Sequence, residues 1–467
     1  MRMREGKWGR GGRAVNIAQG ATWRRRSRAL VLSLGCILVL GLLVTACSLS
    51  DTTSAPVGTG AGDVVPTATA SSDSSYLHVP PKGDSFQARV NYTVNWYLNH
   101  MTLDQKLGQM FLIETYGQSY NADVDNMVRN LYAGAMIIYG KNMQTPQQLH
   151  DYIAAIQSHA QIPLMVTMDE EGGVVDRLGY FHFDPPLPSA QQLAAGSLQQ
   201  TEETGAQAAK EMQALGINTD LAPVVDVRSV PNAVEYTRLF GNDPTTVTKY
   251  AGAFLTGLQE NGEIACLKHW PGIGSITLDP HKTLPTITRS LDQLQSTDFA
   301  TFRSLLALQP GMIMVTHVIV QALDPTMPAT LSPILVNGVL RGQLGYQGVV
   351  MTDSLYMDAI SQKYTLPQAA VLSVIAGDDL LEGAFDSYSM SGMLAALHTA
   401  IDSGSITTDR IDQSVNRILR LKARFGLLPL KPLPNVTYPG SPTAPAATAT
   451  TAFASFNADF RHDDTAA

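Results

Sequence analysis

The segment from Lys268 to His281 holds the side chains that are best suited to chemistry. An apolar run, 264–267, leads directly into Lys268 and His269, so both side chains stand where a strand is expected to end. The glycine-containing loop after them delivers Asp279 and His281, and side chains two positions apart share one face of an extended segment. A carboxylate so placed can orient an imidazole and support its charged form. The pair predicts a general acid/base, although a loop histidine satisfied by a neighbour is the simpler alternative.

Asp353 is the second candidate for a reacting group. It closes the apolar run 348–352, so its carboxylate is expected at the end of another strand. A carboxylate in that position can act as a nucleophile towards the anomeric carbon of a sugar, as in retaining glycoside hydrolysis. The structural alternative is an N-cap for the next helix.

Basic side chains near these groups suit sugar recognition. Lys268 and His269 can donate hydrogen bonds to substrate hydroxyls, and Lys268 can also neutralise neighbouring aspartates. Arg238 precedes a predicted helix start, and a guanidinium beside a pocket suits hydroxyls or a carboxylate. Its alternative is a surface ion pair with Asp243.

Acidic residues complete the set. Asp169 can accept hydrogen bonds from two sugar hydroxyls, but Glu170 and Glu171 come directly after it, so one of the three acids can be structural instead. His317 is expected to support the site from behind. A metal site is the competing chemistry, since His and Asp are common ligands. No HxxxH or HExxH spacing occurs, and Lys268 would oppose a bound cation, so we expect neither a metal nor another cofactor.

The elements that would position these residues alternate between short apolar runs and helical patterns. Several runs are continuously apolar, as in parallel strands buried on both faces. Eight strands alternating with helices predict an α/β fold of the (β/α)8 TIM-barrel type, with an open doubly wound sheet as the alternative. The expected strands are Met110–Ile113, Ala135–Tyr139, Pro163–Met168, Ile217–Val225, Ile264–Lys268, Met312–Thr316, Gly348–Thr352 and Val374–Leu380. The expected helices are Pro146–Ser158, Gln200–Leu215, Pro244–Asn261, Leu291–Ala307, Ser332–Leu344 and Leu366–Ala376.

A barrel of this type places its chemistry at the C-terminal ends of its strands. Six of the expected strands carry polar side chains there, which solubility alone does not explain. These side chains are Asp169, Asp226, Lys268 with His269, Thr316 with His317, Asp353, and Asp378 with Asp379.

The N-terminal 46 residues have the pattern of a targeting signal rather than of a folded segment. Arg24, Arg25 and Arg26 precede an apolar stretch of fifteen residues, 29–43, which is too short to span a bilayer comfortably. The stretch ends in a segment that resembles a bacterial lipobox, and this resemblance implies cleavage before Cys47 and lipid attachment to it. An ordinary secretory signal and an uncleaved anchor are the alternatives.

Composition divides the rest of the chain into a tether, one domain and a tail. Residues 47–88 are rich in Ser, Thr, Ala, Gly and Pro and are expected to form the tether, and residues 431–467 form a similar tail. Between them, residues 89–430 form one domain. Only Cys266 of the three cysteines would remain unmodified, so no disulfide framework is expected. A net charge of −8 argues against nucleic acid as a partner, and we expect a monomer.

Several of these segments together resemble glycoside hydrolase family 3, in its single-domain, NagZ-like β-N-acetylhexosaminidase branch. The KHFPGHG…DSH motif of that branch corresponds to residues 268–274 and 279–281, and its DQEGGRVQR segment to residues 169–177. Its RSFG, APVLD and nucleophile-bearing segments correspond to residues 238–241, 222–226 and 352–353. The resemblance covers the whole domain.

The resemblance implies a retaining, two-step exo-hydrolysis of terminal β-linked N-acetylglucosamine from peptidoglycan fragments or chitooligosaccharides. Asp353 would be the nucleophile, His281 the acid/base, and Asp279 the group that holds His281. The residues implied in sugar binding are Asp169, Arg177, Arg238, Lys268 and His269. With the lipobox, the resemblance implies an extracytoplasmic enzyme that is anchored to the bacterial membrane.

Three departures from the branch pattern are visible. Ile273 replaces the second histidine of the glycine loop, Pro280 replaces a serine, and residues 169–174 lose the usual glutamine and arginine, the latter at Val174. None removes the expected nucleophile or acid/base, but the lost arginine bears on sugar preference. A related β-glucosidase-like enzyme and a non-catalytic cell-wall-binding lipoprotein are therefore the two rival hypotheses.

Overall fold

The computed structural model describes residues 85–181, 186–231 and 233–434. The predicted signal peptide, Cys47 and nearly all of the predicted tether and tail lie outside these residues. The described part begins with helix α1 (Phe86–His100). No helix among the described residues is both long and apolar enough to cross a membrane.

Eight parallel strands form the central sheet, in the order β12-β9-β7-β6-β3-β2-β1-β13. The two edges of this sheet meet, because Met351 bridges Leu380 and the Thr352 amide donates to the Leu380 carbonyl over 3.0 Å. The predicted (β/α)8 barrel is therefore confirmed, and the open-sheet alternative is wrong. The strands are β1 (Phe111–Glu114), β2 (Ala135–Ile137), β3 (Met165–Met168), β6 (Thr219–Asp220), β7 (Ile264–Trp270), β9 (Met312–Val315), β12 (Val349–Thr352) and β13 (Leu381–Ala384).

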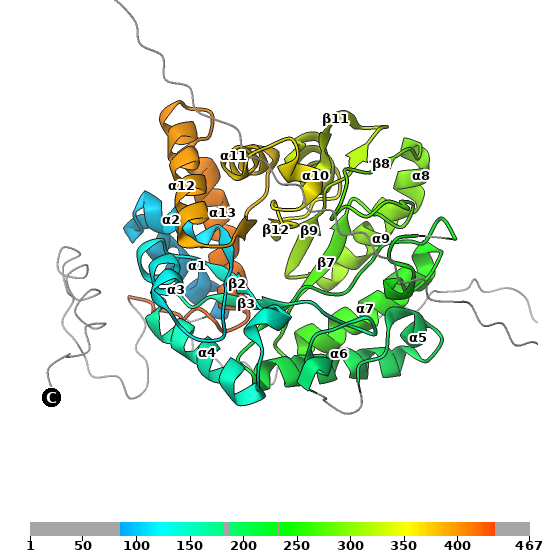
Figure 1. Cartoon of the computed structure of the whole chain (residues 1–467), viewed down its shortest axis with the longest axis horizontal. Coiled ribbons are helices and arrows are strands. Elements are labelled where there is room, and N and C mark those ends of the chain that lie inside the picture. The colour runs from blue at the N-terminus through cyan, green and yellow to red at the C-terminus, as the bar shows by residue number, and fades with distance from the viewer. Residues whose placement is uncertain (1–84, 182–185, 232, 435–467) are drawn as a thin grey trace, which may run out of the picture. The chain divides into compact units, whose positions relative to one another are not determined.

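Helices surround the strands in a ring (Figure 1). Most begin at a Ser, Thr or Asp side chain that accepts a hydrogen bond from the first turn, as Asp243 does from the Thr246 amide. The ring consists of α4 (Pro146–His159), α6 (Leu198–Ala214), α7 (Pro244–Glu260), α8 (Leu291–Ser296), α9 (Asp298–Leu305), the π-helix η7 (Ile334–Gln343), α11 (Leu366–Ala376) and α12 (Ser387–Asp402).

Shorter elements fill the connections. Two small sheets lie outside the barrel: β4 (Glu170–Gly172) with β5 (Val175–Asp176), and β8 (Thr286–Ile287) with β10 (Ile319–Val320) and β11 (Asp324–Pro328). The remaining α-helices are α2 (Leu103–Gln109), α3 (Ala122–Asp125), α5 (Ala190–Ala194), α10 (Asp358–Ser361) and α13 (Thr408–Arg424). The other single turns are η1 (Asn126–Asn130), η2 (Gly140–Asn142), η3 (Leu178–Phe181), η4 (Tyr236–Arg238), η5 (Leu306–Leu308) and η6 (Ala329–Leu331).

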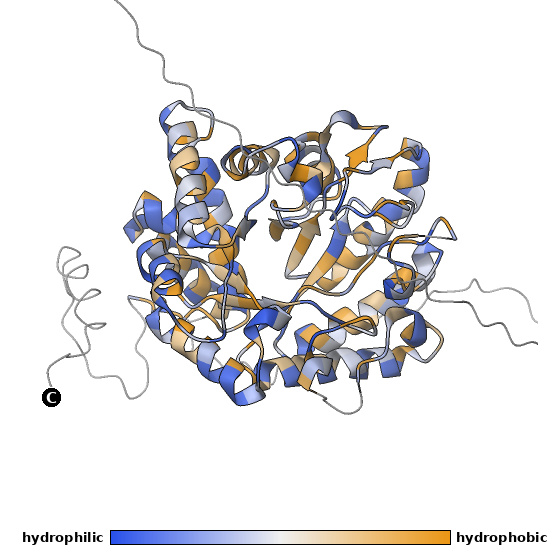
Figure 2. Ribbon diagram, in the orientation of Figure 1, coloured by the Kyte–Doolittle hydropathy of each residue, from blue (hydrophilic) through white to orange (hydrophobic). Residues whose placement is uncertain are grey.

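Apolar side chains gather on the barrel strands and on the helix faces that cover them (Figure 2). Trp270 at the end of β7 is fully buried and packs on Phe299 and Phe302 of α9, with ring centroids 4.9 and 5.1 Å away. Cys266 is also buried in β7. Each barrel strand has one face toward the barrel interior and the other toward the ring of helices. This explains why the continuous apolar runs are buried on both faces, as expected.

The eighth strand does not lie where the sequence pattern predicts it. Residues 374–376 continue helix α11, which ends at Gly377 with φ of +123°. The strand itself begins only at Leu381. The predicted strand Val374–Leu380 is therefore wrong. Asp378 and Asp379 precede β13 and lie at the N-terminal end of the barrel, opposite the end where the other strand-end side chains gather.

Asp379 instead binds helix α13 to the N-terminal end of the barrel. Its carboxylate pairs with Arg341 at 2.5 Å and Arg417 at 3.0 Å, and it accepts hydrogen bonds from Ser414 and from the Val350 amide. Further along α13, Lys422 donates to the Gln109 side chain, and Arg424 donates to the Gln309 carbonyl. Since Gln109 and Gln309 precede barrel strands, α13 closes the base of the barrel.

The two ends of the described chain contact each other. Helix α1 packs along α13 (Figure 1). The Lys431 amide donates to the Thr93 hydroxyl over 2.8 Å, and Arg89 donates to the Leu430 carbonyl over 3.0 Å. The domain therefore starts and finishes at its base.

We expect the Asp379→Asn substitution to lower the free energy of unfolding by about 3 kcal/mol, because it leaves buried arginines without their counter-charge. Asp378→Asn is the matched control. Both carboxylate oxygens of Asp378 are buried without a hydrogen-bond partner, and burial holds its pKa well above the usual range, so a neutral amide should change stability by less than about 1 kcal/mol. Urea unfolding of the two variants checks this, and equal losses would contradict it.

Lys422 predicts a pH dependence of stability. Burial lowers its pKa to about 7, so between about pH 7 and pH 10 the unfolded chain holds a proton that the folded protein does not. Stability contributed by this group rises with pH across that window and is lost as the pH falls. We expect Lys422→Met to flatten this slope and to stabilise the protein at pH 7. Exposed Lys363, changed to Met, is the control in thermal unfolding at several pH values and should keep the slope.

Candidate active site

A cavity of about 600 Å³ opens at the C-terminal ends of the barrel strands. Seven of the eight predicted active-site residues line it, and the eighth, Asp279, lines an adjoining recess that also reaches His281 and Asp353. Residues spread over 185 positions of the sequence thus share one site. The seven are Asp169, Arg177, Arg238, Lys268, His269, His281 and Asp353.

Asp353 comes directly after β12 and presents its carboxylate to the cavity. Oδ2 accepts a hydrogen bond from the Thr316 hydroxyl at 2.7 Å, and Oδ1 accepts one from the Ser354 amide at 2.9 Å. Burial opposes ionisation, but the imidazoles of His317 and His269 and these hydrogen bonds lower the pKa of Asp353. The next helix, α10, starts only at Asp358. The N-cap alternative for Asp353 is therefore wrong.

His317 holds the loop that carries Asp353. Its buried ring lies between the Thr330 hydroxyl, 2.7 Å from Nδ1, and the Ser354 carbonyl, to which Nε2 donates over 2.9 Å. The ring does not line the cavity. The expected supporting position of His317 agrees with these contacts.

Asp279 and His281 form a pair at the edge of the cavity. Asp279 Oδ1 accepts from Nδ1 of His281 at 2.8 Å and from its backbone amide at 2.9 Å. Burial raises the pKa of Asp279, but these bonds outweigh it and lower the pKa. The imidazole side chain is 69% exposed and is oriented so that Nε2 remains for another partner. The alternative of a histidine satisfied by its neighbour accounts for Nδ1 only.

Lys268 and Arg238 neutralise a group of acids on one wall of the cavity. Lys268 Nζ lies 2.6 Å from both Asp169 and Glu171, and Arg238 binds Glu171 through two hydrogen bonds of 2.7 Å. Burial opposes the charged form of Glu171, but the two cations hold its pKa well below the usual range. Lys268 therefore neutralises neighbouring acidic side chains, which is one of the two roles expected for it. The predicted surface pair between Arg238 and Asp243 is wrong, because Asp243 caps α7 instead.

The three neighbouring acids of this wall differ in position. Asp169 and Glu171 line the cavity, and Arg177 lies 3.9 Å from Asp169 at the same wall. Glu170 points away from it and accepts from the Arg177 and Leu178 amides at 2.8 and 2.9 Å. Burial raises the pKa of Glu170 to about 10. Glu170 is thus the structural acid of the three.

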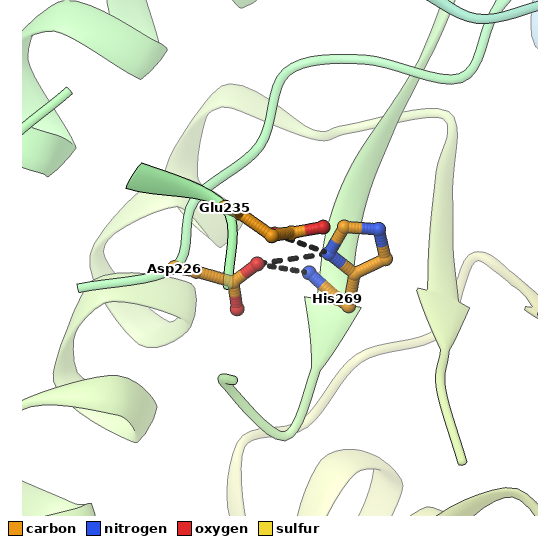
Figure 3. A group of neighbouring side chains, drawn as sticks. All are labelled: Asp226, Glu235 and His269. Carbon is orange, nitrogen blue, oxygen red and sulfur yellow. Dashed lines mark hydrogen bonds and ion pairs between the residues drawn. The ribbon is translucent and has the colours of Figure 1, made fainter. Parts of the chain in front are cut away.

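His269 is held from behind by two carboxylates (Figure 3). Its Nδ1 lies 2.8 Å from Asp226 and 3.5 Å from Glu235. Burial would lower the pKa of His269, but Glu235 and Asp226 raise it. Nε2 is the ring nitrogen left for the cavity, which His269 lines.

The same three side chains bring potential metal-ligand atoms within 4.8 Å of one another. Hydrogen bonds and ion pairs already account for this arrangement. Asp226 accepts from the Ile273 amide at 2.7 Å and from the His269 amide, and Glu235 also pairs with Arg238. The cation beside Glu235 would oppose a second positive charge.

The three departures from the family pattern lie in different surroundings. Ile273 is buried and packs in the apolar core beside the barrel. Pro280 is buried between Asp279 and His281 and leaves their hydrogen bonds intact. Val174 is 71% exposed, at the turn between β4 and β5.

Sequence reasoning missed several polar side chains of the cavity, among them Glu114, Tyr139, Lys141 and Glu382. Glu114, Tyr139 and Lys141 lie at the ends of strands β1 and β2 or just beyond them, and strand-end position was a usable signal for them. Glu114 and Lys141 form an ion pair. Glu382 lies on β13 and was missed because that strand was misplaced. Its carboxylate accepts a hydrogen bond from the Tyr139 hydroxyl at 3.0 Å.

The sequence from residue 102 to residue 421 matches the glycosyl hydrolase family 3 N-terminal domain. The chain belongs to glycosyl hydrolase family 3. It is 34% identical to β-hexosaminidase LpqI of Mycobacterium tuberculosis over 327 residues, which cover 68% of this chain and 82% of the relative. It is 30% identical over 336 residues to β-hexosaminidase A of Pseudoalteromonas piscicida, covering 65% of this chain but only 55% of that longer protein.

Solved structures of the family agree with the barrel. A family 3 β-N-acetylglucosaminidase from Paenibacillus sp. FPU-7 superposes with a TM-score of 0.67 at 32% identity, over 75% of this chain and 65% of the other. The structure of M. tuberculosis LpqI superposes with a TM-score of 0.63 at 32% identity, over 71% and 95%. The prediction of a family 3 glycoside hydrolase is confirmed.

We expect Glu171→Gln to lower the free energy of unfolding by about 3 kcal/mol in this family 3 barrel, because Lys268 and Arg238 would then share too little negative charge in a buried wall. Exposed Glu202→Gln on α6 is the control and should change stability by less than about 0.5 kcal/mol. Urea unfolding at pH 7 measures both. An unchanged midpoint for Glu171→Gln would show that the wall is not held together by charge.

Proposed function

We propose that this family 3 glycoside hydrolase is a retaining exo-β-N-acetylhexosaminidase that removes terminal β-linked N-acetylglucosamine. The observation that carries the proposal is the joint placement of two oriented groups on one cavity. These are the half-buried carboxylate of Asp353, whose pKa is lowered, and the imidazole of His281, whose Nδ1 is bonded to Asp279. The names of the relatives, β-hexosaminidase and β-N-acetylglucosaminidase, support the choice of sugar.

In the first step, an Asp353 oxygen attacks the anomeric carbon while the bond from that carbon to the leaving oxygen breaks. Nε2 of His281 gives its proton to the leaving oxygen. The hydrogen bond from Nδ1 to Asp279 supports the ring through its charged form. The product is a covalent glycosyl ester on Asp353.

In the second step, neutral His281 removes a proton from water through Nε2. The water oxygen attacks the anomeric carbon, and the ester bond to Asp353 breaks. Asp353 returns to its carboxylate, which the Thr316 hydroxyl and the Ser354 amide stabilise. Two inversions at the same carbon retain the β configuration.

The wall formed by Lys268, Asp169, Arg238 and Arg177, together with His269, is suited to bind the sugar. Paired charges of this kind offer donors and acceptors whose positions are already fixed, so little ordering is needed when sugar hydroxyls bind. Ile137, Leu221 and Met314 also line the cavity, and their apolar surface suits the faces of a sugar ring. Peptidoglycan fragments and chitooligosaccharides carry terminal sugars of the proposed kind.

We expect wild type to release 4-nitrophenol from its β-N-acetylglucosaminide, and Asp353→Ala to lower kcat/KM by about 10⁴-fold or more. His281→Ala should lower it by about 10²-fold on the nitrophenyl glycoside and further on chitobiose, whose poorer leaving group needs the proton. His150→Ala, on exposed helix α4, is the matched control and should match wild type.

The outcome separates the rival hypotheses. Turnover of the β-glucoside but not of the N-acetylglucosaminide would support the β-glucosidase-like rival and would overturn the proposed sugar. Binding of sugars with no turnover of either glycoside would support the non-catalytic rival. Equal loss in His281→Ala on good and poor leaving groups would exclude His281 as the acid.

We further propose that Cys47 carries a lipid and that the enzyme acts outside the cytoplasm at the bacterial membrane, as the arginine-preceded apolar stretch before it suggests. In a bacterial host, the wild-type chain should take up labelled palmitate and sediment with membranes. Cys47→Ala should take up no label. Equal labelling of the two chains would exclude Cys47 as the attachment site.

A further inference from the structure

Glu382 is a buried acid that faces the cavity without a cation. It is 3% exposed, lies on β13, and lines the same cavity as Asp353 and Asp169. Its Oε1 accepts from the Tyr139 hydroxyl at 3.0 Å, and among the described residues nothing else donates to this carboxylate. Three other acids of the cavity differ, because Glu114 has Lys141, and Asp169 and Glu171 share Lys268.

The charges around Glu382 favour its neutral form. Burial raises its pKa well above the usual range, and the carboxylates of Asp353, Asp169 and Glu114, which approach it from β12, β3 and β1, raise it further. From β2, the Tyr139 hydroxyl donates to it and opposes this effect only in part. A carboxylic acid in these surroundings carries a proton that it can donate.

A purely structural role leaves this arrangement unexplained. Buried polar groups in folded proteins are normally hydrogen-bonded. Asp226, for example, accepts from the Ile273 amide with one oxygen and pairs with the His269 ring through the other. Glu382 has a single hydrogen-bond partner, and it lines a cavity that Ile137, Leu221 and Met314 also line. The further hydrogen-bond partner that is open to the Glu382 carboxyl group is a molecule bound in the cavity.

We propose that Glu382 is a specificity-determining residue that touches the bound sugar and donates a hydrogen bond to one oxygen of it, with Tyr139 fixing its orientation. This inference rests on the proposed function, because it assigns Glu382 to the subsite that holds the terminal sugar. It adds a polar contact from β13 to those from β7, which carries Lys268. The sugar is thereby bound by residues of both strands.

The test measures sugar binding rather than turnover. The full-length chain and its variants are titrated calorimetrically with N-acetylglucosamine, N-acetylgalactosamine, glucose and xylose, which differ at single ring positions. We expect Glu382→Gln, a neutral donor of the same shape, to bind within about threefold of wild type. Glu382→Leu should lose about tenfold for the sugars that carry the recognised oxygen, and nothing for the sugar that lacks it.

Glu263→Leu is the matched control. Glu263 is also fully buried with a pKa raised by burial, but it lies at the start of β7, away from the cavity. Its substitution should leave every dissociation constant unchanged, with the fold verified by circular dichroism. A Glu382→Leu variant that melts like wild type and yet binds the sugars less tightly supports the proposal.

Two results would overturn it while leaving the proposed function standing. Unchanged binding by Glu382→Leu would make Glu382 structural. Weak binding by both Glu382→Gln and Glu382→Leu would show that the ionised form is required. A wild type that binds none of the four sugars would reject the proposed function as well, so the two failures are distinguishable.

Discussion

The buried charge wall of Lys268, Asp169, Glu171 and Arg238 is the constraint on which the candidate site depends. An ionised group enclosed by protein is costly unless it is paired and hydrogen-bonded, and here each charge has its partner within 2.6 or 2.7 Å. The residues come from the ends of three different strands and the loops after them. A barrel mouth in which one of them is missing would leave the others uncompensated, so the wall also fixes how these loops approach one another.

The placement of charge also explains why the acidic residues of the cavity differ in their bonding partners. Asp169 and Glu171 are paired with Lys268, and Glu171 also with Arg238. Asp353 has no basic side chain bonded to it among the described residues and accepts hydrogen bonds from Thr316 and Ser354 instead. In the same described residues, neither a cation nor a backbone amide donates to the Glu382 carboxylate. The neighbours of each carboxylate thus suit the different roles that we propose for them, as counter-ion, nucleophile or neutral donor.

Much of this could be predicted from the sequence. Continuous apolar runs that end in polar residues predicted the barrel and the cavity residues Asp169, Lys268, His269 and Asp353, because strand length and strand-end position are local properties. His281 followed from its spacing to Asp279, Arg238 from its place before a helix, and Arg177 only from the resemblance to family 3. The eighth strand was misplaced because apolar residues continue from α11 through 374–376, and helix and strand runs of that kind look alike. Only the position of Gly377 in the fold separates them. The ion-pair partner of a basic residue could not be predicted from the sequence either. Asp243, the alternative partner considered for Arg238, caps a helix, whereas Glu171, 67 positions away in the sequence, binds Arg238.

The base of the barrel has a consequence for how the enzyme meets a large substrate. Helix α1 packs along α13, and the segment around Lys431 is hydrogen-bonded to α1, so the described chain enters and leaves on the side opposite the cavity. The first described residue, Ser85, is therefore at the end of the barrel away from the cavity. A large molecule that enters the cavity approaches the barrel from the end opposite to the one where the described chain begins.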